Sequence, residues 1–220
     1  MLPSFITFTG VDLQTSIPRM MALAADYPVE FAFLLSPSRQ GTGRFPPREF
    51  IRHVLSYRSS RFKFAAHLID EYSANLVETQ ATGLEASGDL EGFERVQVNS
   101  DSPELSPKKI RQWADAQGML PILQCADVFP DDPSVQWLFD PSKGTGRRPL
   151  SWPAAPGAGL VGYAGGIGPD NVADVVGQLE QVSQNYWIDM ASGVRGPNNR
   201  FDLDKCRQVC VAVYGEPIGA

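Results

Sequence analysis

The sequence is poor in the residues that bind metals and nucleic acids. Its 220 residues include only two histidines, His53 and His67, and three cysteines, with no CxxC or Cys/His zinc spacing. A metal site is therefore not expected, and the thiols are expected to be reduced. Lysine and arginine number 19 against 25 aspartates and glutamates, and the basic residues are scattered. Because contacts with a phosphate backbone need clustered cations, no nucleic-acid partner is expected.

Long apolar runs are also missing. The first residues have neither a basic leader nor the apolar core of a signal peptide. The longest stretch without charge, residues 149–169, is rich in proline and glycine, so it could not cross a membrane as a helix. We expect no membrane partner and a cytoplasmic location. Nothing in the sequence predicts the oligomeric state.

Short apolar runs alternate with helical patterns along the whole chain. The runs that read as strands are residues 5–9, 30–35, 62–68, 95–99, 121–125, 136–139, 159–163 and 186–190. Strand–helix alternation predicts a parallel sheet, and eight such units predict one (β/α)₈ TIM barrel over residues 1–220. The segment between the fifth and sixth strands is too short for a helix. The alternative, an open doubly wound sheet, carries a glycine fingerprint after its first strand, where only Gly10 stands here.

Glycine-rich loops follow the last three strands. They read KGTGRR after the sixth strand, GGIGPDNV after the seventh and SGV after the eighth. In a (β/α)₈ barrel a phosphate often binds after strands seven and eight, where glycines let the backbone approach and a helix N-terminus presents free N–H groups. We therefore expect a phosphate site here, although each loop alone would also fit an ordinary turn.

These motifs resemble one known family, phosphoribosylanthranilate isomerase. The segments GYAGGIGPDNV, IDMASGVRG and WLFDPSKGTGRRPLSW are similar to its GG-x-x-P-[ED]-N-V loop, its D-x-S-S-G-V-E loop and its L-L-D segment with the following G-G-T-G-K loop. The segment VQVNSDSPE is similar to V-Q-L-H-G-x-E, and the start ITFTGVD takes the place of K-I-C-G-[LI]-[TR]. The resemblance is specific in the last third of the chain and loose in the first half.

The resemblance implies roles for residues that match the family motifs. It implies that the sugar phosphate is held by Gly165, Gly166, Ser192 and Gly193. It implies that Asp140 is the general acid and that Arg44 meets a carboxylate of the substrate. The loop over the substrate would be Gly144, Thr145 and Gly146. Asp189 would orient its loop rather than do chemistry.

The general base is the main departure from the family. The catalytic cysteine of the family falls on Thr9, and a threonine hydroxyl is not a base near neutral pH without an activator. Asp12, just after the first strand, and His67, at the end of the third, are the candidate bases. Asp12 could equally cap a helix, and His67 could be a buried core histidine. The glutamate of the SSGVE motif is replaced by Arg195.

We therefore expect an enzyme of isomerase type that acts on a phosphorylated sugar or phosphoribosyl adduct, by acid–base catalysis of an aldose–ketose conversion. No cofactor is implied. Two alternatives remain open: a paralogue that catalyses another phosphosugar reaction, such as a lyase or epimerase, and a barrel that binds a phosphorylated ligand without catalysis.

Overall fold

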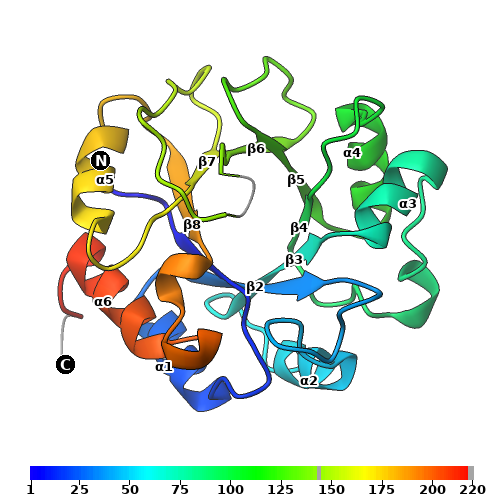
Figure 1. Cartoon of the computed structure of the whole chain (residues 1–220), viewed down its shortest axis with the longest axis horizontal. Coiled ribbons are helices and arrows are strands. Elements are labelled where there is room, and N and C mark those ends of the chain that lie inside the picture. Colours follow the sequence, from blue (N-terminus) through cyan, green and yellow to red (C-terminus); the bar gives the residue numbers. More distant parts are fainter. Residues whose placement is uncertain (143–144, 218–220) are drawn as a thin grey trace.

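Eight parallel strands close into a barrel in the computed structural model, which describes residues 1–142 and 145–217 (Figure 1). Each strand pairs with the next in the chain, and β8 pairs with β1. The strands are β1 (Ile6–Thr9), β2 (Val29–Leu35), β3 (Lys63–Leu68), β4 (Arg95–Val98), β5 (Leu120–Cys125), β6 (Gln136–Phe139), β7 (Val161–Ala164) and β8 (Tyr186–Met190). The prediction of a (β/α)₈ barrel is confirmed.

Helices form an outer ring around the strands. They are α1 (Ile17–Asp26), α2 (Arg48–Leu55), α3 (Glu71–Thr79), α4 (Pro107–Ala116), α5 (Val172–Leu179) and α6 (Leu203–Tyr214), with short 3₁₀ turns at Glu85–Ser87, Ser192–Val194 and Pro197–Asn199. As the short connection predicted, no helix separates β5 from β6. The described part of the β6–β7 connection also has none.

The helix that follows β7 begins at Val172, three residues after Pro169. The side chain of Asn171 accepts a hydrogen bond from the N–H of Gly168 (3.0 Å) and donates one to the carbonyl of Gly166 (2.8 Å). These two bonds hold the preceding residues in a turn, so the helix starts only after it. The turn places the positive end of α5 beside the glycine loop of β7.

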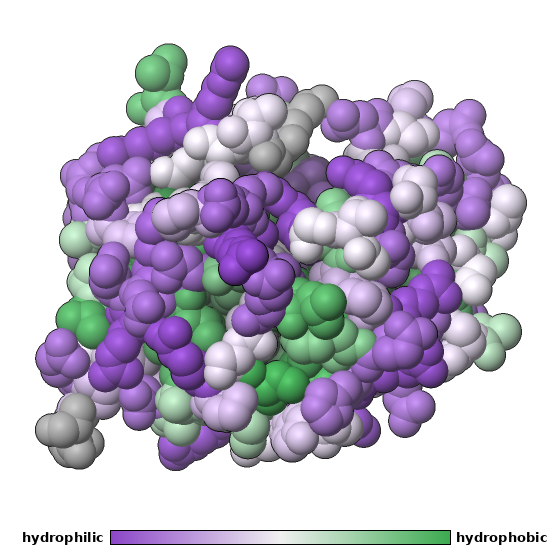
Figure 2. Space-filling model, turned by 60° about the horizontal axis from the view of Figure 1, so that its bottom comes forward, coloured by the Kyte–Doolittle hydropathy of each residue, from purple (hydrophilic) through white to green (hydrophobic). Residues whose placement is uncertain are grey.

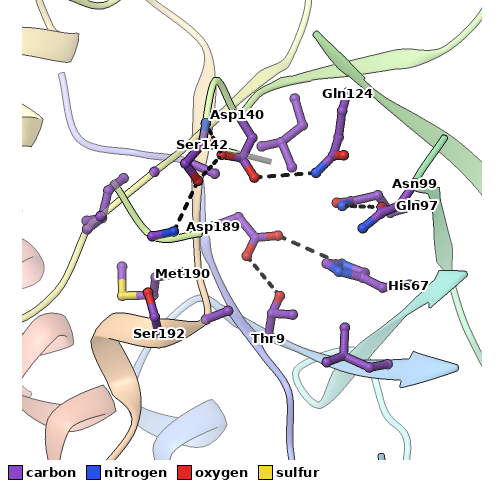
Figure 3. A pocket seen from close by; sticks show the side chains of 18 of the residues that line it. Thr9, His67, Gln97, Asn99, Gln124, Asp140, Ser142, Asp189, Met190 and Ser192 are labelled. Carbon is purple, nitrogen blue, oxygen red and sulfur yellow. Dashed lines mark hydrogen bonds and ion pairs between the residues drawn. The ribbon is translucent and has the colours of Figure 1, made fainter. Parts of the chain in front are cut away.

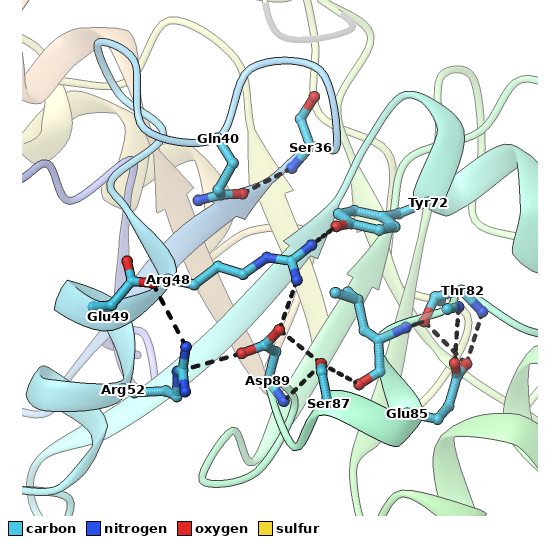
Figure 4. Close-up of polar contacts among 12 residues, drawn as sticks. Ser36, Gln40, Arg48, Glu49, Arg52, Tyr72, Thr82, Glu85, Ser87 and Asp89 are labelled. Atoms are coloured by element: carbon cyan, nitrogen blue, oxygen red, sulfur yellow. Dashed lines mark hydrogen bonds and ion pairs between the residues drawn. The ribbon is translucent and has the colours of Figure 1, made fainter.

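A polar cluster fastens α2 to the connection between α3 and β4 (Figure 4). The buried carboxylate of Asp89 accepts from Arg48 (2.9 Å) and Ser87 (2.6 Å) and pairs with Arg52 (3.4 Å). Arg48 also donates to the hydroxyl of Tyr72. These contacts join α2, the start of α3 and the α3–β4 connection.

Two apolar layers fill the molecule, one between the barrel and its helices and one inside the barrel. The inner layer lies on the β5–β8 side and consists of Ile122, Leu138, Ala164 and Trp187, with Phe5 and Leu160 beside it. A Cβ atom at Gly162 would lie 2.4 Å from the Trp187 ring, so only glycine fits at that position. On the face seen in Figure 2, side chains are mostly hydrophilic and the apolar ones form separate small patches.

Buried polar residues fill the other half of the barrel interior. At its floor, Arg95 of β4 pairs with Glu30 of β2 at 3.0 Å, and both side chains are buried. Thr7 of β1 donates to the same Glu30 carboxylate (2.9 Å), and Gln136 of β6 accepts from Arg95 (3.0 Å). The guanidinium also lies 4.2 Å from the centre of the Trp187 ring. One ion pair therefore links strands from both halves of the barrel.

Breaking this ion pair should destabilise the fold. Arg95→Ala leaves the Glu30 carboxylate buried without a counter-ion, and such a loss costs about 3–5 kcal/mol. Lys63→Ala, which breaks the exposed Lys63–Glu94 pair (3.2 Å) on the neighbouring strand, should cost less than about 1 kcal/mol. Urea denaturation followed by circular dichroism measures both, and equal losses in the two variants would contradict the assignment.

Candidate active site

A cavity of about 120 Å³ opens where the carboxyl ends of the strands converge (Figure 3). This is the end of a (β/α)₈ barrel where active sites form. The lining residues come from all eight strands or the loops that follow them: Thr9, Leu34, Arg44, His67, Gln97, Asn99, Gln124, Leu138, Asp140, Ser142, Gly146, Ala164, Gly165, Gly166, Ile167, Asp189, Met190, Ala191 and Ser192. Two of these are carboxylates, Asp140 and Asp189.

Asp140 directly follows β6, and its backbone N–H donates to the carbonyl of Cys125 (2.9 Å), which fixes it at the mouth of the barrel. Its Oδ1 accepts from the hydroxyl (2.7 Å) and the backbone N–H (3.1 Å) of Ser142. Its Oδ2 lies 3.4 Å from the side-chain nitrogen of Gln124 on β5. The carboxylate is thus held in one orientation by its own loop and by the neighbouring strand.

Asp189 of β8 lines the same cavity. The hydroxyl of Thr9 donates to its Oδ1 at 2.8 Å. Its Oδ2 lies 3.8 Å from Nε2 of His67, which is too long for a hydrogen bond. Figure 3 shows the three side chains, from β8, β1 and β3, turned toward one another. Thr9, at the position of the family cysteine, therefore orients a carboxylate that could itself act as a base.

Burial sets the protonation of this group. It raises the pKa of Asp189 to about 7, against the hydrogen bond from Thr9, and the nearby carboxylate of Asp140 adds to the rise. Burial also lowers the pKa of His67 to about 3, with help from the charge of Arg95. Near neutral pH the Asp189 carboxyl can therefore both take and give a proton, while His67 is neutral. A base works best when its pKa lies near the working pH.

The three glycine loops meet beside the cavity, backbone against backbone. A Cβ atom on Gly193 would lie 2.0 Å from the carbonyl oxygen of Ile167, and one on Gly166 would lie 2.6 Å from the backbone nitrogen of Arg148. Gly166 also has a φ of +63°, which favours glycine. Side chains are thus excluded where the loops after β6, β7 and β8 touch.

A second hollow, of about 330 Å³, lies next to these loops. It shares Gly146, Gly166 and Ser192 with the cavity. Its other lining residues are Gly168, Pro169, Asp170, Asn171, Gly193, Lys205 and Gln208. Glycine backbone, a serine hydroxyl, the start of α5 and a lysine together form a setting suited to an anion.

The structure brings most of the expected site residues together. Asp140, His67, Arg44, Gly146, Gly165, Gly166 and Ser192 line the cavity, and Gly193 lines the hollow. Arg44 rather than Arg39 reaches the cavity, because Arg39 is paired with Asp70 (2.6 Å). Thr145 is exposed, and its hydroxyl donates to the carbonyl of Ser142 (2.7 Å). Gly144 lies outside the described residues.

Asp12, one of the two expected bases, is not brought to the cavity. Its Oδ2 pairs with Arg195 (3.2 Å) and accepts from the N–H of Phe201 (2.7 Å), and its Oδ1 accepts from the N–H of Gln14 (3.2 Å). The carboxylate thus links the loop after β1 to the segment after β8. Arg195 likewise faces Asp12 (3.2 Å) and the carbonyl of Gly10 (2.5 Å).

Sequence reasoning missed several residues of the site. It treated Asp189 as a loop-orienting group, and it did not single out Ser142, Gln97, Gln124 or Lys205. A signal was present for the strand residues, because inward positions alternate along a strand and Gln97, Gln124 and Asp189 each come just before the last residue of theirs. Lys205 is brought in only by the packing of α6.

Within the described chain no cluster of three or more His, Cys, Asp or Glu side chains is arranged to hold a metal ion. Among the helices of those same residues, none has the length and apolar character needed to span a membrane. Cys125, at the end of β5, is not among the residues that line the cavity, and burial raises the pKa of its thiol to about 12.

The chain is similar to N-(5'-phosphoribosyl)anthranilate isomerase from Trichlorobacter lovleyi, with 33% identity over 122 residues. That match covers 51% of this chain and 57% of the relative, so it spans little more than half of the relative's length. No family model matches the chain. The resemblance of the sequence motifs to the phosphoribosylanthranilate isomerase family is confirmed by this match.

Solved structures share the fold over nearly the whole chain. The TrpF structure from Jonesia denitrificans superposes with a TM-score of 0.65 at 18% identity, covering 96% of this chain and 97% of the other. Phosphoribosyl anthranilate isomerase from Thermotoga maritima gives 0.62 at 14% identity, covering 98% and 100%. A phosphoribosyl anthranilate isomerase in complex with reduced 1-(o-carboxyphenylamino)-1-deoxyribulose 5-phosphate gives 0.61 at 14% identity, also covering 98% and 100%.

The raised pKa of Asp189 makes stability depend on pH in a stated direction. Between about pH 4 and pH 7 the folded protein holds a proton that the unfolded chain releases. The stability that this proton contributes is fully present below about pH 4 and is lost as the pH rises through 7. Relative to Asp189→Asn, the wild type should lose up to about 1.4 kcal/mol per pH unit over that range. Chemical denaturation at several pH values measures the difference, and a constant difference would contradict it.

The contact between the loops after β7 and β8 should be required for anion binding. Gly193→Ala places a methyl group against backbone, so the loops must separate. We expect at least tenfold weaker binding of inorganic phosphate, by calorimetry, and a loss of about 1–3 kcal/mol in stability. Gly157→Ala, whose added Cβ meets nothing within 4 Å, is the matched control. Unchanged phosphate affinity in Gly193→Ala would remove the hollow as the anion site.

Proposed function

We propose that this chain, a relative of the phosphoribosylanthranilate isomerases, is an acid–base isomerase of a phosphorylated sugar. The observation that carries the proposal is that two oriented carboxylates, Asp140 and Asp189, line one cavity that shares residues with an anion-suited hollow. An aldose–ketose conversion needs one group to deliver a proton to oxygen and another to remove a proton from carbon.

The phosphate would bind in the hollow. The backbone of Gly166 and Gly193 and the hydroxyl of Ser192 would surround it, the start of α5 would add its dipole, and Lys205 would add a positive charge. The Nζ of Lys205 donates to the carbonyl of Arg195 (2.7 Å), which keeps this side chain beside the hollow. Binding energy from the phosphate end would then position the sugar carbons between the two carboxylates.

Asp140 would act as the general acid. It would protonate the ring oxygen of the sugar, so that the ring opens and the first carbon forms a double bond to its substituent. Ser142 and Gln124 would keep the carboxyl aimed at that oxygen.

Asp189 would act as the general base in place of the family cysteine. It would take the proton from the second carbon, and the electron pair of that bond would move to form an enol or enolamine. Transfer of a proton to the first carbon and loss of the proton from the hydroxyl on the second carbon then give the ketose, so the reaction is an isomerisation without net loss or gain of atoms. Thr9 and neutral His67 would be positioning residues, one fixing the carboxylate and the other facing the reacting carbons.

Names of similar proteins support a phosphoribosyl substrate. The relative from Trichlorobacter lovleyi is named for N-(5'-phosphoribosyl)anthranilate, and the solved complex holds a reduced arylamino deoxyribulose 5-phosphate. The substrate of this chain would accordingly be a five-carbon sugar phosphate, with the arylamine adduct as the first compound to test.

Substituting either carboxylate should stop turnover but not binding. We expect Asp140→Asn and Asp189→Asn each to lower kcat/KM by about 10²–10⁴-fold, measured by the loss of fluorescence of N-(5'-phosphoribosyl)anthranilate and by NMR with ribose 5-phosphate. Inorganic phosphate should bind both variants as it binds the wild type. Asp115→Asn, on the exposed face of α4, is the control. Full activity in Asp189→Asn would overturn its role, and absence of turnover of both compounds by the wild type would overturn the isomerase.

A further inference from the structure

We propose that Asn199 is a positioning residue, which holds Arg44 in the direction needed to meet a carboxylate of the substrate. The proposal rests on the proposed function, in which the arylamine adduct is the first compound to test, and on the role that the family resemblance implies for Arg44. It adds to the site a residue from the 3₁₀ turn after β8, Pro197–Asn199.

Arg44 lies in the loop between β2 and α2. Among the described residues that line the cavity, it is the one lysine or arginine. Hydrogen bonds within the loop hold the backbone around it, from the N–H of Gly41 to the carbonyl of Phe45 (2.7 Å) and from the N–H of Phe45 to the carbonyl of Thr42 (2.9 Å). The arginine side chain has many rotamers, so a fixed backbone does not by itself fix the guanidinium group.

Asn199 supplies a contact that orients this guanidinium group. Its Oδ1 accepts a hydrogen bond from Nη2 of Arg44 at 3.2 Å, although the two residues are 155 positions apart in the sequence. A guanidinium group has five N–H donors, and this bond uses one of them. A carboxylate is bound best by two parallel N–H donors, and a group that is already aligned loses less entropy when the substrate binds.

The same asparagine also contacts a second arginine. Its backbone carbonyl accepts from Nε of Arg195 (2.9 Å) and also from Nη2. Arg195 is buried and paired with Asp12 (3.2 Å), so it is a fixed point of the structure. Burial lowers the pKa of Arg195, and the nearby charge of Arg44 adds to this effect. Two oxygen atoms of Asn199 thus bridge two arginines that would otherwise repel each other.

The backbone of Asn199 is adapted to this bridge. Its φ is +57°, in the left-handed region, which asparagine adopts more readily than most other residues. The turn is also closed by backbone hydrogen bonds, from the N–H of Asn199 to the carbonyl of Gly196 (3.2 Å) and from the N–H of Gly196 to the carbonyl of Arg200 (2.8 Å). One conformation of the turn therefore presents both oxygen atoms to the two arginines.

Glycine substitutions test the bridge and keep the backbone conformation. Asn199→Gly removes Oδ1, and glycine adopts a positive φ freely. Asn198→Gly is the matched control, because Asn198 is exposed and left-handed as well (φ +61°) and no hydrogen bond joins its side chain to another described residue. Thermal unfolding shows whether the two variants are equally folded.

Three probes separate the carboxylate contact from the rest of the site. Reduced 1-(o-carboxyphenylamino)-1-deoxyribulose 5-phosphate, the ligand of the solved complex, carries a carboxylate. Ribose 5-phosphate and inorganic phosphate do not. Calorimetry measures the Kd of each probe for the wild type, Asn199→Gly, Asn198→Gly, Arg44→Met and the double variant Arg44→Met/Asn199→Gly.

We expect Asn199→Gly to bind the carboxylate probe about threefold to tenfold more weakly and the other two probes as the wild type does. Asn198→Gly should bind all three probes like the wild type. Arg44→Met should bind the carboxylate probe at least tenfold more weakly, because it loses a charged donor. In the Arg44→Met background, Asn199→Gly should cause no further loss, because Asn199 acts through Arg44.

Other results would overturn the positioning role. They are equal weakening of ribose 5-phosphate and the carboxylate probe by Asn199→Gly, which indicates a structural role, a further loss in the Arg44→Met background, or carboxylate-probe binding to Asn199→Gly that is unchanged or tighter. If Arg44→Met binds the carboxylate probe like the wild type, the positioning role fails and the isomerase proposal stands.

Failure of the proposed function has a different signature. If the expected binding differences are found but the wild type turns over neither N-(5'-phosphoribosyl)anthranilate nor ribose 5-phosphate, the positioning role holds and the isomerase proposal fails. If the wild type binds none of the three probes, both fail.

Discussion

The buried ion pair between Glu30 and Arg95 supports the whole polar half of this barrel. A charge inside a protein is tolerable only when it is paired and hydrogen-bonded. Here Thr7, Gln136 and the Trp187 ring complete the surroundings of the pair. The positive charge of Arg95 lowers the pKa of His67. It also opposes the larger rise that burial causes in the pKa of Asp189. The arginine at the floor of the barrel thus shifts the pKa values of two residues in the cavity above it.

A second constraint is the contact between the loops after β6, β7 and β8. Backbone meets backbone there, and only glycine leaves enough room. This contact places glycine residues along the hollow, and Gly146, Gly166 and Ser192 line both the hollow and the cavity. Phosphate binding and chemistry would therefore depend on the same closure of the barrel, so a change that separates the loops would affect both.

Thr9, which stands at the position of the family cysteine, contacts Asp189. In the proposed mechanism the base lies on β8, the strand paired with β1, and the Thr9 hydroxyl holds it (2.8 Å). The Asp12–Arg195 pair occupies two other positions that depart from the family. The family motifs have threonine or arginine where this chain has Asp12, and glutamate where this chain has Arg195. In this chain the acidic residue of the pair therefore follows β1 and the basic residue follows β8.

The sequence alone predicted the eight strands, the closed barrel and the glycine loops after its last three strands, because strand–helix alternation, glycine spacing and the motif at residues 165–171 are local patterns. Through motif positions it also singled out Asp140 and Arg44, and both line the cavity. Only the tertiary structure decided which carboxylate faces the cavity. Asp12 and Asp189 are both aspartates near strand ends, but Arg195 and Phe201, distant in sequence, occupy the first, while Thr9 and burial leave the second at the centre of the site. Burial and partners far along the chain set a pKa, and neither can be read from a local run of residues.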